Sequence, residues 1–251
     1  MSIWALSDLH LAISVPSKTM EVFGPGWKNY AERIRSNWEK MISAEDLVLI
    51  PGDICWAMRL EEAVIDLQWI DSLPGTKVIL RGNHDYWWSS SAKMQKVMPK
   101  SIHFIHNNVF MWKGIAIGGS RLWDTPEYNF SGFNVFQENP KERAKTTEES
   151  HHKPEEDEKI FVRELERLTL SLSQMPKEAA YKIAMTHYPP IGADLAPSRA
   201  SKILESFGVN TCVFGHLHNI RAKSLAFGKA RGIDYQFTSC DYLEFVPVKI
   251  L

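Results

Sequence analysis

The sequence predicts an α/β protein built on parallel strands that are joined by crossover helices. Short apolar runs at about 46–50 and 77–80 have the length of buried strands, and the stretches 27–42 and 59–72 repeat apolar residues at helical spacing. This alternation of strand and helix favours a parallel sheet. Ligands bind at the carboxyl ends of the strands in such sheets, so polar residues that directly follow the strands are the candidates for a site.

The composition is that of a globular domain without a charge bias. The chain has 251 residues, of which 29 are basic and 30 acidic, and its net charge is −1. This length fits one domain spanning residues 1–251, and the balanced charge does not favour general binding to nucleic acid. No apolar run approaches the roughly 18 residues of a membrane-spanning helix, so no membrane span is expected.

Cysteine usage indicates the compartment. Cys55, Cys212 and Cys240 are odd in number and form no CxxC pair, which is typical of a protein from a reducing compartment and not of a disulfide framework. The first strand is expected to begin near residue 2, which leaves no room for a signal peptide. We therefore expect a cytoplasmic protein.

The elements of the N-terminal half follow from apolar periodicity and from the positions of Pro and Gly. In order, they are a strand at 2–7, a helix at 27–42, a strand at 46–50, a helix at 59–72, a strand at 77–80 and a short helix at 89–98. Pro74-Gly75 marks the end of the second helix. The loop after the first strand is rich in Pro and Gly.

The C-terminal half begins with short strands and ends in a β-rich tail. Its expected elements are strands at 102–106, 108–112 and 114–118, a helix at 155–173, a strand at 181–186, a helix at 198–207 and a strand at 211–214. The long segment at about 121–158 has no clear apolar period. A loop of that length inside a compact domain is usually functional or disordered, so we expect a lid or insertion there.

Five of the expected strands lead into side chains that bind metals. The residues delivered at these strand ends are Asp8 and His10, Asp53, Asn83 with His84 and Asp85, His187, and His216 with His218. Residues two apart on an extended chain can face one point, and the glycines before three of these groups allow close approach of the backbone. Nitrogen and oxygen ligands favour Mn²⁺, Fe, Zn²⁺, Ni²⁺ or Co²⁺, and the set is large enough for two cations.

The chain closely resembles the calcineurin-like metallophosphoesterase family in five motifs. In chain order they are Asp8-x-His10, Gly52-Asp53, Gly82-Asn83-His84-Asp85, His187 and Gly215-His216-x-His218. The resemblance implies a four-layer α/β/β/α sandwich with a dinuclear metal site at the strand ends. The chain departs from the family where Ile54-Cys55-Trp56 follow Asp53, since many relatives continue there with polar or acidic residues.

The resemblance also implies the ligands of each ion. One ion is assigned to Asp8, His10, Asp53 and His218, and the other to Asp53, Asn83, His187 and His216, with Asp53 as the bridge. The implied cofactors are two divalent transition-metal ions, with Mn²⁺ as the first choice and Fe, Zn, Ni or Co as alternatives. The implied reaction is hydrolysis of a phosphomonoester or phosphodiester by a hydroxide that bridges the ions. His84 is expected to protonate the leaving oxygen, with Asp85 fixing its ring.

Two other functions stay open. A nuclease acting on DNA or RNA requires a basic groove, which the balanced charge does not favour. A non-catalytic binding module on the same scaffold is expected to lack metal ligands or His84, whereas all of them are present. We therefore expect a small-molecule phosphate ester as the substrate.

Further residues near the strand ends have two interpretations each. Arg59, Arg81 and Arg121 are candidates for phosphate contacts, because a guanidinium group binds phosphate in a bidentate manner, but they can equally form surface ion pairs. The run Tyr86-Trp87-Trp88 either walls a substrate groove or packs in the core.

Overall fold

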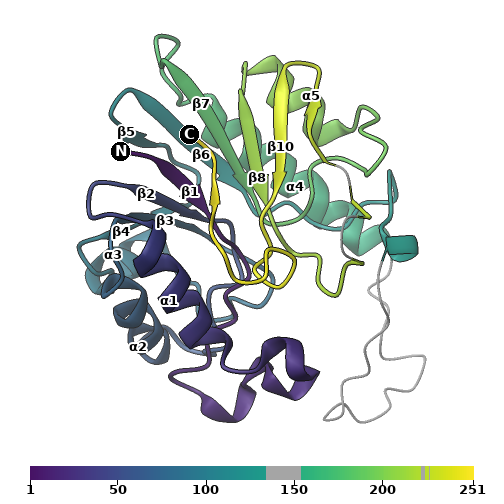
Figure 1. The fold of residues 1–251 in the computed structure, drawn as a ribbon. Coiled ribbons are helices and arrows are strands. Elements are labelled where there is room, and N and C mark those ends of the chain that lie inside the picture. The colour runs from purple at the N-terminus through teal and green to yellow at the C-terminus, as the bar shows by residue number, and fades with distance from the viewer. Residues whose placement is uncertain (134–153, 222–223, 226) are drawn as a thin grey trace.

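The computed structural model describes residues 1–133, 154–221, 224–225 and 227–251. Its strands form two sheets that pack against each other, and helices cover both outer faces (Figure 1). This is the α/β/β/α sandwich that the family resemblance implies. The alternation of strands and helices alone suggested one parallel sheet, and it did not reveal that the strands divide between two.

The first sheet holds the strands of the N-terminal half. Its spatial order is β11 (Val248–Lys249), β1 (Ile3–Ala5), β2 (Leu47–Ile50), β3 (Thr76–Leu80) and β4 (Ile102–Ile105). The strands β1 to β4 are parallel, and β11 closes one edge as an antiparallel strand. All of β2 is buried, as expected for a parallel strand that is covered on both faces.

The second sheet holds the strands of the C-terminal half. Its spatial order is β5 (Phe110–Trp112), β6 (Ile115–Ser120), β7 (Tyr181–Thr186), β8 (Thr211–Phe214), β10 (Ile233–Phe237) and β9 (Lys229–Ala230). The four central strands β6, β7, β8 and β10 are parallel, and β5 and β9 are antiparallel edge strands.

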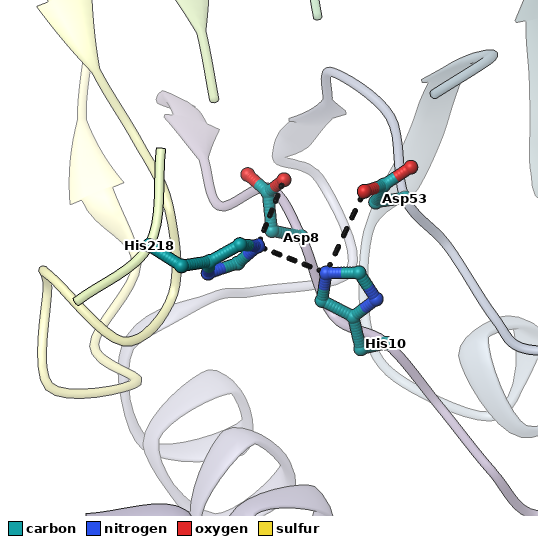
Figure 2. Close-up of side chains that lie close together, drawn as sticks. All are labelled: Asp8, His10, Asp53 and His218. Atoms are coloured by element: carbon teal, nitrogen blue, oxygen red, sulfur yellow. Dashed lines mark hydrogen bonds and ion pairs between the residues drawn. The ribbon is translucent and has the colours of Figure 1, made fainter. Parts of the chain in front are cut away.

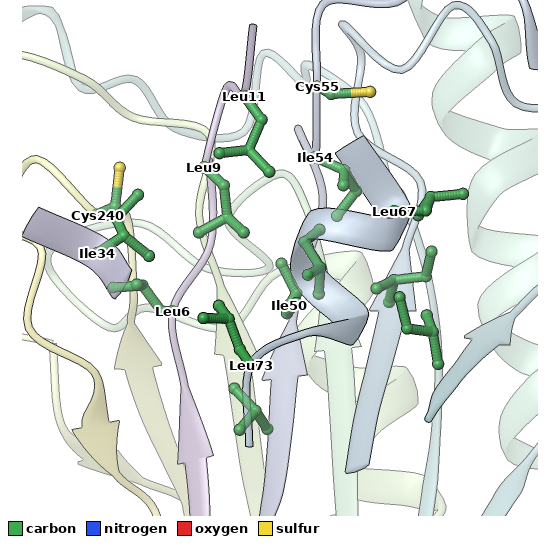
Figure 3. Close-up of a cluster of buried hydrophobic side chains, with 14 of the residues drawn as sticks. Leu6, Leu9, Leu11, Ile34, Ile50, Ile54, Cys55, Leu67, Leu73 and Cys240 are labelled. Carbon is green, nitrogen blue, oxygen red and sulfur yellow. The ribbon is translucent and has the colours of Figure 1, made fainter. Parts of the chain in front are cut away.

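Three helices cover the outer face of the first sheet (Figure 1). They are α1 (Tyr30–Met41), α2 (Leu60–Asp71) and α3 (Ser91–Val97). Ile34 of α1 and Leu67 of α2 belong to one buried cluster with Ile50 of β2 (Figure 3). Burial of each such side chain stabilises the fold by about 1.5–3 kcal/mol, so this layer holds the strands that lead into the site.

Two helices cover the second sheet, namely α4 (Pro154–Leu172) and α5 (Arg199–Ser206). Phe161 of α4 and Leu204 of α5 pack with Phe214 of β8. The hydroxyl of Ser198 accepts the backbone N–H of Ser201 at 2.9 Å and so caps the start of α5.

A third apolar cluster lies between the two sheets. Leu47 and Leu49 of β2 share it with Ile117 of β6 and Met185 of β7. Val48 of the same strand belongs to the outer cluster under the helices, because successive side chains of a strand point to opposite faces. This double burial sets the register of β2 and keeps the two sheets together.

Several bounds differ by one to three residues from those expected, as for the strand expected at 2–7, which is Ile3–Ala5, and two expected segments need a fuller account. The helix expected at 27–42 begins only at Tyr30, because Asn29 has a left-handed φ of 52° and short 3₁₀ turns precede it. Of the insertion expected at 121–158, residues 134–153 lie outside the described residues, and 154–158 form the start of α4. In the described part of the chain, no helix is long and apolar enough to cross a membrane.

Candidate metal centre

The five strand ends meet at one edge of the sandwich. Three of them, after β1, β2 and β3, come from the first sheet, and two, after β7 and β8, come from the second. Asp8 of the first sheet and His187 of the second show the convergence, since Asp8 Oδ1 lies 3.9 Å from His187 Nδ1. The predicted residues therefore gather between the carboxyl edges of both sheets.

Four buried or half-buried side chains form a compact group at this edge (Figure 2). One ligand atom each of Asp8, His10, Asp53 and His218 lies within 4.8 Å of the others. His10 Nε2 lies 2.9 Å from His218 Nε2 and 3.5 Å from Asp53 Oδ2. His218 Nε2 lies 3.6 Å from Asp8 Oδ1. Two carboxylates and two imidazoles at these distances make a candidate metal site.

A second group of predicted ligands also lies against Asp53. The amide oxygen Oδ1 of Asn83 lies 2.6 Å from His187 Nε2 and 3.0 Å from His216 Nδ1. His187 Nε2 also lies 3.5 Å from Asp53 Oδ2. All seven residues predicted as metal ligands are thus brought together, and Asp53 contacts an imidazole of each group.

The backbone around the ligands is tightly folded. Asp8, His10, Asp53 and His216 all have positive φ, between 45° and 74°, a conformation that costs free energy for residues other than glycine. At Gly215, an added methyl group would overlap the Asp8 carboxylate. The chain before His216 therefore comes so close to Asp8 that it requires a glycine at position 215.

The buried carboxylates are strongly perturbed. Burial raises the pKa of Asp8 to about 6, although His218 and hydrogen bonds oppose the increase. Those bonds come from Ser7 Oγ at 2.5 Å, Ser239 Oγ at 2.9 Å and the backbone N–H of His216 at 3.0 Å. Burial, followed by repulsion from Asp8, also raises the pKa of Asp53 well above its usual value. Two close buried carboxylates favour a bound cation.

The pKa values of the site histidines shift in opposite directions. Burial, with help from neighbouring histidines, lowers the pKa of His10 and His187 well below normal and that of His216 to about 3. Burial alone would lower the pKa of His218 too, but Asp241 and the two buried carboxylates raise it to about 9. Neutral imidazoles are the form that ligates metals.

The sequence interpretation missed Asp241. Its Oδ1 lies 3.0 Å from His218 Nδ1, and its Oδ2 accepts the backbone N–H of Asn219 at 3.0 Å. Burial alone would raise the pKa of Asp241, but His218 lowers it below the usual value. The sequence did contain a signal for Asp241, because this residue follows the strand β10 in the same way as the candidate ligands follow their strands. A carboxylate behind a metal-binding imidazole fixes its tautomer and orientation.

His84 lies beside the first group of ligands. Its ring centroid is 5.6 Å from that of His10 and 4.6 Å from that of Trp56. Burial, followed by the charge of His218, lowers the pKa of His84 to about 4. Within the described residues, the buried Nδ1 of His84 has no hydrogen-bond partner.

Asp85 was expected to fix the His84 ring, but among the described residues it accepts no hydrogen bond from that ring. Asp85 Oδ1 accepts the N–H of Ile54 at 2.9 Å and the indole N–H of Trp87 at 3.0 Å, and Oδ2 accepts the N–H of Gly82 at 2.7 Å. Both oxygens are therefore used by donors from the backbone and the core. Asp85 joins the loop after β2 to the loop after β3.

Aromatic side chains surround the ligands. Trp56 stacks on His10 with ring centroids 5.0 Å apart, and Tyr188 lies over His216 at 3.8 Å. Trp87 and Trp88 are buried in the core cluster and Tyr86 is exposed. Tyr86 could face a substrate, and Trp88 also lines a cavity with Arg81.

The comparison with known families matches this geometry. The model of the calcineurin-like phosphoesterase family matches residues 1–219. The chain belongs to the calcineurin-like phosphoesterase family. The match includes every predicted metal ligand and both residues of the expected His84 and Asp85 pair.

The similarity of this chain to individual known proteins is weaker. The Gene 66 protein of Mycobacterium phage D29 is 31% identical over 85 residues, which make up 34% of this chain and 40% of the phage protein. The chain therefore matches less than half the length of this relative. The phosphopantetheinyl hydrolase PptH from Mycobacterium tuberculosis is 16% identical with a TM-score of 0.55, covering 100% of this chain and 95% of PptH. That likeness shows a shared fold. Protein AQ665 from Aquifex aeolicus has a TM-score of 0.48 at 16% identity, over 99% of this chain and 95% of AQ665.

Proposed function

We propose that this protein hydrolyses phosphomonoesters or phosphodiesters with two divalent transition-metal ions, Mn²⁺ being the first choice. The observation that carries the proposal is the pair of buried carboxylates, Asp8 and Asp53, surrounded by imidazoles at the strand ends. The substrate is proposed to be a small-molecule phosphate ester. The three cysteines are free and buried, which supports a reducing, cytoplasmic location.

The side chains fit metal ions chemically. His187 donates its Nδ1–H to the carbonyl oxygen of Pro51 at 3.0 Å, so the neutral ring turns an unprotonated Nε2 toward the site. That Nε2 faces the Asn83 oxygen and the Asp53 carboxylate. These atoms are all acceptors, and a cation among them would satisfy them together. The absence of thiolate from the group favours Mn²⁺ or a similar ion over a structural zinc.

The protein groups have distinct roles in the proposed reaction. Two bound cations would lower the pKa of a water molecule and offset the charge on the phosphoryl oxygens. The chain supplies Asp53 between the two groups of ligands, and Asp8 and Asn83 on either side. The Asp53 carboxylate also accepts the backbone N–H of His84 at 2.8 Å, which places the imidazole beside the site.

His84 is proposed to bind the substrate phosphate and to protonate the leaving oxygen. Its pKa of about 4 reflects burial and the charge of His218. A bound phosphate anion opposes both effects, because an opposite charge favours the protonated ring. General acid catalysis of this type contributes about 10²–10⁴-fold.

The segment expected to form a lid is proposed to select the substrate. Its described part lines a cavity of about 300 Å³ that also reaches His216. Tyr128 of this part donates its hydroxyl to the carbonyl oxygen of Pro189 at 2.7 Å, so the segment is bonded to the loop that carries His187.

The proposed activity is tested with bis-p-nitrophenyl phosphate and p-nitrophenyl phosphate in the presence of Mn²⁺, Co²⁺, Ni²⁺ or Zn²⁺. We expect metal-dependent release of nitrophenol that is lost in Asp53→Asn and kept in Glu39→Gln. Glu39 is a matched control because it is an exposed residue of α1. Failure of the protein to hydrolyse either ester with any of the ions would overturn the proposal.

A further inference from the structure

A second cavity, of about 330 Å³, lies beside the metal centre. The last residues of three strands line it, namely Leu80 of β3, Ile105 of β4 and Ser120 of β6. Among the candidate metal ligands, Asn83 follows β3 itself, and His187 follows β7, which is the neighbour of β6. The cavity is therefore at the same edge of the sandwich as the metal centre, one strand further along, and its lining shares no residue with the described metal ligands.

The lining of this cavity has an excess of positive charge. Arg81, Arg121 and Arg167 contribute three guanidinium groups, and Glu164 is the acidic residue among the described lining residues. The Glu164 carboxylate lies 2.7 Å from Arg167 Nη1 and 3.7 Å from Arg121 Nη2. His106 also lines the cavity, and burial, with Arg167 and Arg81, lowers its pKa. One carboxylate cannot balance three guanidinium groups.

Two of the arginines are incompletely paired. The Nε atoms of Arg81 and Arg121 are buried and have no hydrogen-bond partner among the described residues. Arg121 is held deeply, with its side chain only 11% exposed. Burial lowers its pKa, Glu164 opposes this effect, and Arg81 lowers it further. Buried cationic donors without partners cost free energy, which a bound anion would recover.

We propose that this arginine pocket, formed by Arg81, Arg121 and Arg167, binds a second phosphate group of the substrate. The substrate class is then a phosphate ester that carries another phosphate beyond the one that is hydrolysed. Guanidinium groups suit phosphate because their N–H donors match its oxygens in pairs. The hydroxyls of Ser89 and Ser90 also line the pocket, and its volume leaves room for the phosphate and part of the linking group.

The pocket is tested first by binding alone. Calorimetry with inorganic phosphate and the metal-free protein reports on the arginines, because the metal centre without its ions presents buried carboxylates that repel an anion. We expect phosphate to bind wild type, and Arg121→Gln and Arg167→Gln to weaken binding roughly tenfold or more. Arg35→Gln is the control, since Arg35 is an arginine of α1 that pairs with Glu39.

Folding of the variants does not limit this test. Arg121 is deeply held, but the Arg167 side chain is 37% exposed on α4, so Arg167→Gln removes one donor with little disturbance of the core. Thermal unfolding checks each variant. The proposal that the arginine pocket binds phosphate would be refuted if wild type bound no phosphate, or if wild type and Arg167→Gln bound it equally.

The substrate class is tested by comparing adenosine 3′,5′-bisphosphate with adenosine 5′-monophosphate. This inference rests on the proposed function, so the metal-loaded protein is used. We expect kcat/KM to favour the bisphosphate by roughly tenfold or more, and Arg167→Gln to remove that preference while Arg35→Gln keeps it. Phosphate binding without any preference would make the pocket a separate anion site and refute the substrate class. If wild type hydrolyses no ester at all, the proposed function fails, while the calorimetry still decides on the pocket.

Discussion

Asp53 connects the two halves of the candidate site. Its Oδ2 lies 3.5 Å from His10 Nε2 and 3.5 Å from His187 Nε2, and its Oδ1 accepts the N–H of His84. Asp8 also lies near an imidazole of each group, but the nitrogen of His187 that it faces, at 3.9 Å, is the Nδ1 that is bonded to a backbone carbonyl oxygen. A residue in the position of Asp53 is suited to bridge two cations, and its replacement affects both.

We predict that Asp53→Asn lowers the metal-dependent hydrolysis of bis-p-nitrophenyl phosphate at least roughly 100-fold, since even the outer partners of metal ligands are worth about 10–100-fold. The amide keeps the shape of the side chain and removes its charge. Steady-state kinetics at saturating Mn²⁺ measure the effect, with Glu39→Gln as the control. Activity within a few-fold of wild type would refute the bridging role.

Asp241 is predicted to position His218. Asp241→Asn removes the charged acceptor at 3.0 Å from His218 Nδ1, so the affinity for Mn²⁺ should fall about 10–100-fold. The measurement is a metal titration at about pH 10, roughly one unit above the His218 pKa of about 9, where most of the imidazole has lost its proton in both proteins. Asp234→Asn on β10 is the matched control, and equal affinities of the two variants would contradict the role.

Metal binding is predicted to strengthen as the pH rises. His218 has a pKa of about 9 and Asp8 a pKa of about 6, so both are protonated at low pH and must lose protons to bind an ion. Between pH 6 and 9, binding displaces the proton of His218, and this proton alone should make the affinity rise by up to about tenfold for each pH unit. Titrations at pH 6, 7, 8 and 9 test this, and an affinity independent of pH would argue against these ligands.

The residues differ in how well the sequence predicts them. The seven expected ligands follow apolar runs directly, and this pattern was readable without coordinates. Asp241 obeys the same rule, but β10 was recognised only as part of a β-rich tail, so its end was not located. The partners of Asp85 could not be predicted, because two of them are the backbone N–H groups of Ile54 and Gly82, whose directions depend on two loops that are distant in sequence.

At the level of elements, the turns after the strands determine how close the ligands come. Gly215 follows β8, and a methyl group there would overlap both the Asp8 carboxylate and the side chain of Ser7. The loops after β1 and β8 belong to different sheets. The glycine thus lets the two sheets approach where the site is built.

We predict that Gly215→Ala lowers the free energy of unfolding by about 1–3 kcal/mol, as expected for overpacking at a tight contact, and weakens metal binding. Chemical denaturation and metal titration measure the two effects. Gly26→Ala is the control, because nothing lies within 4 Å of the added methyl, and its effect should stay within about 0.5 kcal/mol. Similar stabilities of the two variants would refute the close approach.

Most elements lie where apolar periodicity places them, and the strand at 181–186 has the expected bounds. The division of the strands between two sheets was not readable from periodicity, because a buried parallel strand has the same apolar pattern in either. The arginine pocket was likewise hidden, since Arg81 and Arg121 are 40 residues apart in sequence and only the packing of the two sheets against each other brings them together.

At the scale of the whole molecule, bound ions are predicted to stabilise the sandwich. The seven proposed ligands come from both sheets, so ions that bind the folded chain would favour it over the unfolded one. At a concentration 100 times the dissociation constant, Mn²⁺ should raise the melting temperature by about 5–10 °C. Calorimetry with and without a chelator measures this shift, which should be smaller in Asp53→Asn.

The most direct test is the metal content of the purified chain. The protein is equilibrated with Mn²⁺, freed of unbound metal and analysed for metal per chain, beside Asp53→Asn. The two groups of ligands around Asp53 predict about two ions per wild-type chain and at most one in the variant. A wild-type chain that retains almost no metal, or a variant that retains as much as wild type, would contradict the proposed dinuclear centre.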